Sequence, residues 1–213
     1  VPANGPIAIL AARVYQRFRD PEDLRWAQRI VDWIDETLVD HSTSLVWDGI
    51  GRTGDDRIDR DWKFTYTHGV VIGAHTELAE ITGDTRHAER AGATVDAVLT
   101  HLVPGGVLQD EGDGDGAMFR GILARYLTPR EDSRADEILL RSATAAWENR
   151  DAAGRFTPVW HPKPAAPAKA AATSVHHTPD GKSPAGVTLA AHLSGLFLCE
   201  QMAALERAER LPA

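Results

Sequence analysis

The chain has 213 residues, of which 43% are hydrophobic and 25% are charged, a balance typical of a folded protein and not of a disordered one. The net charge of −8 argues against nucleic acid or an anionic membrane as the main ligand, because an acidic surface repels both. The single Cys199 excludes an internal disulfide framework and zinc sites that need several cysteines. The sequence shows neither an uninterrupted membrane-spanning stretch nor a signal peptide.

The spacing of apolar residues predicts helices along most of the chain. A first helix is expected over 5–18, and a second begins after the capping pair Asp20 and Pro21 and continues to Leu38. Further helices are expected over 67–81, from Asp84 to Leu102, and over 117–127, 132–149 and 184–207. Strand propensity is weak and confined to 44–47 and 155–160.

An internal repeat with an offset of 64 residues organises these helices. Asp20 corresponds to Asp84, Ala27 to Ala91, and 38–39 to 102–103, so each unit is a pair of helices. At about 64 residues per helical hairpin, the chain contains about three and a half hairpins. The expected fold is therefore all-α.

Short and long connections alternate between these helices. The long ones are 40–64, 104–116 and 151–183. Because every second connection in a stack of antiparallel helices lies at the same end, the long loops are expected to share one rim, and long loops are usually functional or disordered. They contain Trp and Tyr beside carboxylates, the composition of a sugar site, since aromatic rings stack on sugar C–H faces and hydroxyls need polar partners.

The acidic loop 110–116 has three interpretations. Asp113 and Asp115 are suited to capping the helix that follows, or to binding substrate hydroxyls with or without acid–base work. A calcium loop is the third, although Ala117 and Met118 stand where the EF-hand pattern needs an oxygen ligand and a glycine. Asp55 and Asp56 are interpreted as part of a solvated loop.

Other candidate residues have structural interpretations. His75 and His192 are expected to be packed polar residues, and His176–His177 to belong to a mobile loop, because two adjacent histidines make a poor metal site. Three tryptophans at helix positions are expected to pack in the core or between helices. They are Trp26, Trp33 and Trp147.

Several motifs together resemble glycoside hydrolase family 76. They lie at 46–50 (VWDGI), 62–74 (WKFTYTHGVVIGA), 106–109 (GVLQ), 113–122 (DGDGAMFRGI) and 124–127 (ARYL), and the resemblance covers about 3–160. It implies an (α/α)6 toroid of six helical hairpins, of which this chain holds only part. It also implies endo-acting hydrolysis of α-1,6-linked mannan with retention of configuration, which requires two carboxylates.

The chain departs from the family pattern in three places. The family's catalytic pair is two consecutive aspartates on an earlier hairpin, which is not recognisable here, so the catalytic residues are unassigned. Residues 1–213 are therefore expected to form one toroid-type domain lacking its N-terminal hairpins, with a flexible loop over 162–183. The family's Tyr-Asn-Gln-Gly is Tyr66-Thr67-His68-Gly69 here, and Arg120 replaces a lysine, which favours a different glycan.

The resemblance implies a cleft that binds an oligosaccharide or polysaccharide of the mannan type, without cofactor or metal. In it, Arg120 would orient a carboxylate or contact a sugar oxygen. The twelve residues expected to line it are Trp47, Asp48, Trp62, Tyr66, His68, Gln109, Asp110, Glu111, Asp113, Asp115, Phe119 and Arg120.

Three alternatives to a hydrolase stay open. One is a non-catalytic glycan-binding module, and another is a helical-hairpin domain that binds proteins through an exposed apolar face. A third is another α/α-toroid enzyme, such as a sugar epimerase or an unsaturated-uronide hydrolase. The combination of Asp-Gly-Asp-Gly with Phe-Arg-Gly at 113–121 disfavours this alternative. A further partner is expected in a missing N-terminal segment or in self-association of an apolar face. A secreted or cell-envelope location is expected if the full-length protein has a signal peptide, and a cytoplasmic one otherwise.

Overall fold

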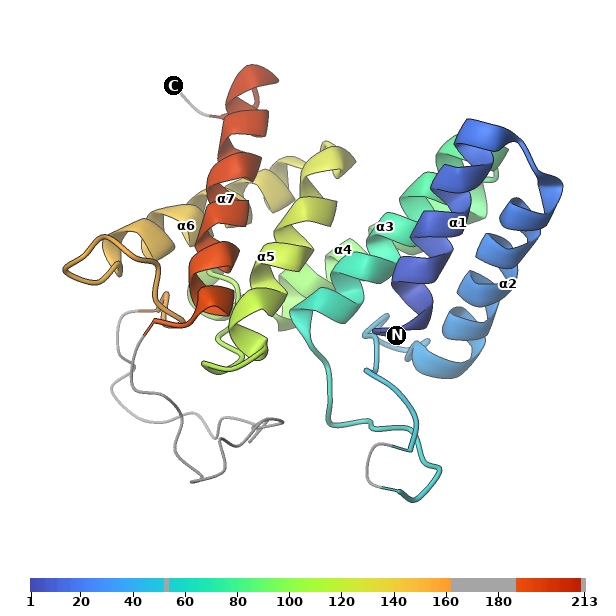
Figure 1. Cartoon of the computed structure of the whole chain (residues 1–213), viewed down its shortest axis with the longest axis horizontal. Helices are drawn as coiled ribbons and strands as arrows, with labels where there is room; N and C mark the ends of the chain where they lie inside the picture. The colour runs from blue at the N-terminus through green and yellow to red at the C-terminus, as the bar shows by residue number, and fades with distance from the viewer. Residues whose placement is uncertain (52–53, 162–186, 212–213) are drawn as a thin grey trace. The chain divides into compact units, whose positions relative to one another are not determined.

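A computed structural model describes residues 1–51, 54–161 and 187–211 (Figure 1). These residues form seven α-helices and two short 3-10 helices, in two compact units, 1–100 and 101–213, each of which is described by itself. Within the described ranges no β-strand forms, and the expected β-like piece at 44–47 is reduced to an isolated bridge between Val39 and Val46. The predicted flexible loop over 162–183, with His176 and His177, lies outside the described residues.

The first unit consists of two helical hairpins, α1 (Asn4–Phe18) with α2 (Pro21–Leu38), and α3 (Thr65–Thr82) with α4 (Thr85–His101). Helix α3 packs beside α1 (Figure 1), and it is buried without interruption from Thr65 to His75. The buried polar residues near its start have hydrogen-bond partners, as burial requires, since Thr67 and His68 both bond to the carbonyl of Phe64.

The two hairpins have the same turn 64 residues apart. Arg19 and Gly83 end the first helix of each pair in the left-handed conformation, with φ of 63° and 69°. Asp20 and Asp84 then accept a hydrogen bond from the backbone N–H two residues later, at 2.9 and 3.0 Å. These are N-caps, so the predicted repeat and both capping residues are confirmed.

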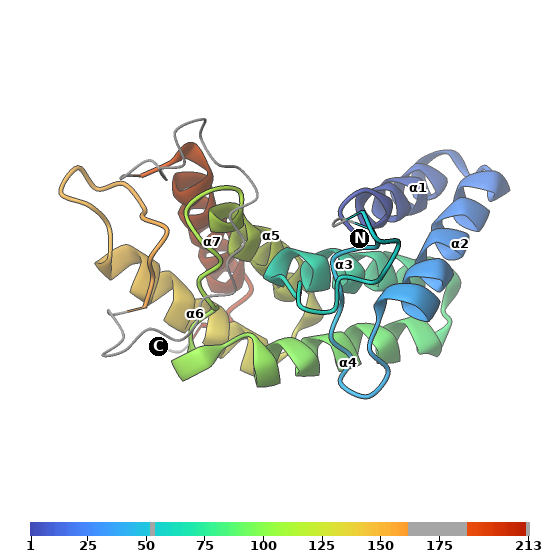
Figure 2. The same cartoon turned by 90° about the horizontal axis from the view of Figure 1, so that it is seen from below.

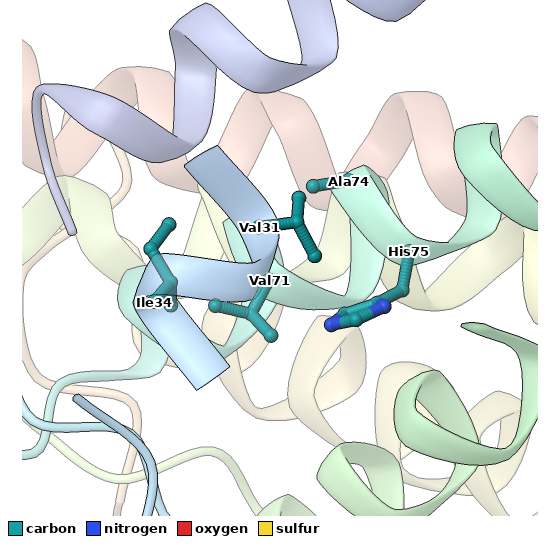
Figure 3. Close-up of a pocket in the computed structure, with 5 residues that line it drawn as sticks. All are labelled: Val31, Ile34, Val71, Ala74 and His75. Atoms are coloured by element: carbon teal, nitrogen blue, oxygen red, sulfur yellow. The ribbon is translucent and has the colours of Figure 1, made fainter. Parts of the chain in front are cut away.

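The core of the first unit is the apolar side of α2. Ala27, Val31, Ile34 and Leu38 are all buried, as their spacing predicts. Between α2 and α3 a small apolar recess is lined by five residues (Figure 3). They are Val31, Ile34, Val71, Ala74 and His75.

The second unit contains α5 (Gly116–Leu127), α6 (Ser133–Glu148) and α7 (Leu189–Arg207), with 3-10 turns at Pro104–Gly106 and Thr128–Arg130. Helix α7 packs on both α5 and α6, and α5 and α7 lie side by side in both views (Figures 1 and 2). Gly121 permits this close approach, since a Cβ there would lie 2.8 Å from the Cα of Ser194. Helix α7 begins after its N-cap Thr188, later than the predicted start at 184.

Three tryptophans were expected in the core or between helices, and for all three the core placement is wrong. Trp26, Trp33 and Trp147 are 48%, 40% and 54% exposed. They lie beside the buried stripes of α2 and α6 and not on them. Arg29 and Arg150 stack on the rings of Trp26 and Trp147, which covers part of the apolar surface. His75 is buried, as expected of a packed polar residue.

None of the helices in the described ranges is long and apolar enough to cross a bilayer.

Candidate functional site

In the first unit, the loop between α2 and α3 folds back on itself. Trp47 donates its backbone N–H to the Leu38 carbonyl at 2.9 Å, and Asp48 donates its own to the Trp62 carbonyl at 2.9 Å. These bonds bring two distant parts of the loop, 46–48 and 62–66, into contact just before α3. The motifs that the sequence separates by about a dozen residues therefore form one structure.

A buried polar pair lies at this junction. The hydroxyl of Tyr66 donates a hydrogen bond to the carboxylate of Asp48, and both residues are buried. Hydrogen bonds to an ionised acceptor are stronger than those between neutral groups. Tyr66 therefore fixes the orientation of the Asp48 carboxylate.

Aromatic rings continue from this pair along the loop. Phe64 stacks on Tyr66 with ring centroids 6.0 Å apart, and Trp62 meets Phe64 edge-on at 5.8 Å. Trp62 keeps part of its surface exposed, whereas Trp47 is buried under the guanidinium of Arg60, 4.3 Å from the ring centroid. Of the two loop tryptophans, Trp62 is thus the one with more surface available for stacking on a sugar.

His68 anchors the loop between α2 and α3 through its ring nitrogens. Its Nε2 accepts the backbone N–H of Val46 at 3.0 Å, and its Nδ1 lies 2.7 Å from the carbonyl of Phe64. This pattern assigns the proton to Nδ1, in a neutral ring. Because the side chain is fully buried, His68 supports the loop here and presents no surface to a ligand.

In the second unit, the acidic loop 110–116 folds back tightly at the start of α5. A Cβ on Gly116 would lie 1.8 Å from the carbonyl oxygen of Glu111, so glycine is required at this position. Asp115 stands at the N-cap position but makes no side-chain capping bond, so the capping interpretation is not supported for it. Among the described residues no group of three potential ligands could hold a metal ion, so the calcium interpretation has no support there.

Arg120, on the first turns of α5, is the central buried charge of this unit. Its Nη1 donates to the carboxylate of Asp110, its Nη2 donates to the carbonyl of Pro158, and its guanidinium lies 3.6 Å above the ring of Trp160. Burial lowers the pKa of Arg120, and the negative charges of Asp110 and Glu111 oppose that shift. The guanidinium nevertheless stays protonated at any physiological pH.

The two long loops of the second unit meet at this arginine. Trp160 donates its backbone N–H to Asp110 Oδ1 at 3.4 Å, and the His161 ring nitrogen Nε2 lies 3.1 Å from the carbonyl of Leu108. The expected gathering of long loops is thus found between 104–116 and 151–161. Trp160 is fully buried and was not among the predicted site residues, because no sequence spacing links it to a partner 50 positions away.

The predicted cleft residues fall into two sets. Five lie in the first unit (Trp47, Asp48, Trp62, Tyr66 and His68) and seven in the second (Gln109, Asp110, Glu111, Asp113, Asp115, Phe119 and Arg120). Within each set the residues lie on one loop and the helix start that follows it. That the two sets line one glycan cleft stays a prediction. Asp55 and Asp56 are both exposed, in agreement with a solvated loop.

The helical hairpins and their loops place the chain among the α/α-toroid proteins. It belongs to glycosyl hydrolase family 76, whose model matches residues 2–210. The predicted family and the all-α hairpin fold are therefore confirmed.

Solved structures of family relatives superpose on nearly the whole chain. The Lin0763 protein from Listeria innocua has a TM-score of 0.81 and 31% identity, covering 97% of this chain and 56% of that one. The α-1,6-mannanase of Salegentibacter sp. HEL1_6 has a TM-score of 0.78 and 36% identity, covering 95% of this chain and 58% of that one. An inactive variant of that mannanase, with two consecutive aspartates replaced, was solved in complex with α-1,6-mannotetrose.

A curated relative is the mannan endo-1,6-alpha-mannosidase of Candida glabrata, 27% identical over 97 residues, which are 45% of this chain and 22% of that protein. The chain therefore spans a little over half the length of its structural relatives and about a fifth of this curated one.

Proposed function

We propose that this chain is a glycan-binding part of an endo-acting α-1,6-mannan hydrolase. The observation that carries this proposal is the similarity to the Salegentibacter α-1,6-mannanase, at 36% identity over 95% of the chain. Similarity at this level over the whole chain includes the loops as well as the helices, and the loops are where function varies on a shared scaffold.

The loop geometry of each unit supports carbohydrate binding. The first unit presents the partly exposed Trp62, while the Asp48 carboxylate is buried and bonded to Tyr66, so it supports the loop. The second presents Asp110, whose side chain is about one-third exposed, at 34%. Aromatic faces and oriented carboxylates are the two kinds of group that sugar C–H faces and hydroxyls require.

The catalytic step of the proposed reaction needs two carboxylates, one as nucleophile and one as general acid and base. The only consecutive aspartates in this sequence are Asp55 and Asp56, which lie exposed in a loop. We therefore infer that this chain positions the glycan and that the nucleophile and the acid–base group belong to a part of the enzyme outside it. The two units would then belong to one toroid-type domain.

Binding and hydrolysis by the chain are measured separately. Calorimetry is expected to show saturable binding of α-1,6-mannotriose, and product analysis is expected to show no cleavage. The reference ligand is an α-1,2-linked mannotriose, and Trp62→Ala is compared with Trp26→Ala, at an exposed tryptophan on α2. Equal binding of both trisaccharides, or no loss with Trp62→Ala, would contradict an α-1,6-mannan site.

A non-catalytic glycan-binding module is the second candidate, and the exposed position of Asp55 and Asp56 favours it. The two candidates predict different results for the complete gene product. A hydrolase predicts that the complete gene product cleaves α-1,6-mannan, with retention seen by NMR of the first-formed anomer. A binding module predicts binding without turnover even then.

A further inference from the structure

Arg120 joins three parts of the second unit through one buried side chain. It is fully buried, yet both terminal nitrogens donate hydrogen bonds, one to the Asp110 carboxylate and one to the carbonyl of Pro158. Among the described residues, its Nε has no hydrogen-bond partner. Through these two hydrogen bonds the arginine links the acidic loop 110–116 to the loop after α6.

Burying this charge is unfavourable unless a partner compensates it. Asp110 supplies the opposite charge, and the ring of Trp160 supplies a face, 3.6 Å below the guanidinium, on which a planar cation packs well. Lysine has one compact ammonium group and cannot reach two loops while stacking on a ring. The site therefore requires arginine for its shape as well as for its charge.

The Asp110 carboxylate is held on one side and exposed on the other. Within the described ranges, its two hydrogen bonds, from Arg120 Nη1 and from the backbone N–H of Trp160, are both made to Oδ1. The side chain nevertheless remains 34% exposed. A carboxylate fixed through one oxygen presents its second oxygen in a defined direction, which suits the acceptance of a hydrogen bond from a sugar hydroxyl.

We propose that Arg120 is a positioning residue, which does not touch the glycan but holds Asp110 so that its exposed oxygen accepts a hydrogen bond from a mannoside hydroxyl. This inference rests on the proposed function for its ligand. The side chain's full burial excludes the other role considered for it, direct contact with a sugar oxygen, in this arrangement.

A double-mutant cycle tests the proposal in the full chain. Asp110→Asn keeps the shape of the side chain and is expected to weaken α-1,6-mannotriose binding by about tenfold, as expected for the loss of a hydrogen bond to a charged group. Arg120→Lys is expected to weaken binding to a similar extent. In the Asp110→Asn background, however, Arg120→Lys should add little, because its effect passes through Asp110.

The matched control is Arg134→Lys, which alters an exposed Arg134–Asp132 pair of the same unit and is expected to leave binding unchanged. Equal loss from Arg120→Lys in both backgrounds would overturn the proposal, because it would mean that Arg120 acts on binding independently of Asp110. Unchanged binding by Arg120→Lys would overturn it as well.

A spectroscopic measurement keeps the proposal testable if Arg120→Lys fails to fold. NMR of the wild-type chain with labelled arginine is expected to show separate, slowly exchanging Nη signals for Arg120, which merge in Asp110→Asn. Averaged Nη signals in the wild type would refute the positioning role. Resolved signals without any mannotriose binding would instead refute the proposed function, so the two failures are distinguishable.

Discussion

The hairpins α1–α2 and α3–α4 have the same pattern of residues 64 positions apart but bury it to different extents. Val71 and Ala74 of α3 are each 2% exposed, because α2 covers them through Val31 and Ile34 (Figure 3). The equivalent residues of α1 are Ile7 and Leu10, which are 52% and 61% exposed.

The outer helices differ in the same way. On α4, Ala97 is buried and Arg90 pairs with Asp35 of α2 at 3.6 Å. The equivalent positions on α2 are the exposed Trp33 and Trp26. The second hairpin packs on the first through one apolar side. Within the residues described, the equivalent side of the first hairpin is also apolar, but no other hairpin covers it. The comparison teaches that, outside the apolar stripes, burial in this repeat depends on whether a neighbouring hairpin covers the position.

The largest expected effect is a charge placed at equivalent positions of the two hairpins. Val71→Asp should lower the free energy of unfolding by about 3 kcal/mol or more, because it buries an unpaired carboxylate. Ile7→Asp, at the equivalent open position, should change it by less than about 0.5 kcal/mol. Urea unfolding measures both. Similar losses for the two variants would mean that the α1 face is also covered in solution.

A pH-dependent stability is expected from a histidine pair that exists only in the covered hairpin. His75 Nδ1 lies 3.1 Å from His87 Nδ1, and His75 Nε2 lies 3.2 Å from the Asp35 carboxylate. Burial, and then the neighbouring His75, lower the pKa of His87 below its usual 6.5. The other charged groups around the pair are Asp32 on α2 and Asp84, Arg86 and Arg90 at the start of α4.

The folded state therefore binds fewer protons at His87 than the unfolded state does. Its contribution to stability is complete above pH 6.5 and is lost as the pH falls through 6.5 towards the lowered pKa of the folded state. Thermal unfolding midpoints between pH 7.5 and 5 measure this loss. His87→Gln should flatten the dependence, whereas His41→Gln, at an exposed loop residue, should not. If His87→Gln leaves the pH dependence of the unfolding midpoint unchanged, other groups cause that dependence.

A smaller effect is expected at the turns, where the first hairpin has Arg19 and the second has Gly83 in the same left-handed conformation. Gly83→Arg should cost about 1 kcal/mol, because a Cβ is strained at this φ. Arg19→Gly should gain less than that, since glycine also loses more entropy on folding. Chemical unfolding of the two variants gives the comparison, and opposite signs are the expected result.

The smallest effect on stability is expected at the exposed tryptophans. Trp33→Gln should lower the free energy of unfolding by less than about 1 kcal/mol, because the residue lies off the buried stripe of α2 and 40% of its surface is already exposed. It should, however, reduce any concentration-dependent association, since Trp33 and Trp26 add apolar surface to the open side of the first hairpin. Sedimentation at several concentrations tests this, and a large destabilisation would show that the ring is packed.

The sequence alone determined the helices apart from the start of α7, the caps Asp20 and Asp84, and the family. A helix depends on contacts three and four residues apart, and caps such as Asp20 and Asp84 act within two residues, so both leave a readable local pattern. The motifs that indicated family 76 are also local runs. These features were predicted closely because each depends on a few consecutive residues.

Only the tertiary structure decided how far residues beside the apolar stripes are buried, and the roles of the site residues. Trp26 and Val31 lie on the same helix, but which of them is covered depends on a neighbouring hairpin. The sequence predicted that His68 lines the glycan cleft, whereas in the structure its side chain is buried and bonded to the backbone of Val46. Arg120, Asp110 and Trp160 lie on separate elements. The buried ion pair is favourable only when these residues are close together, and the fold alone brings them close. No local sequence pattern could therefore predict it.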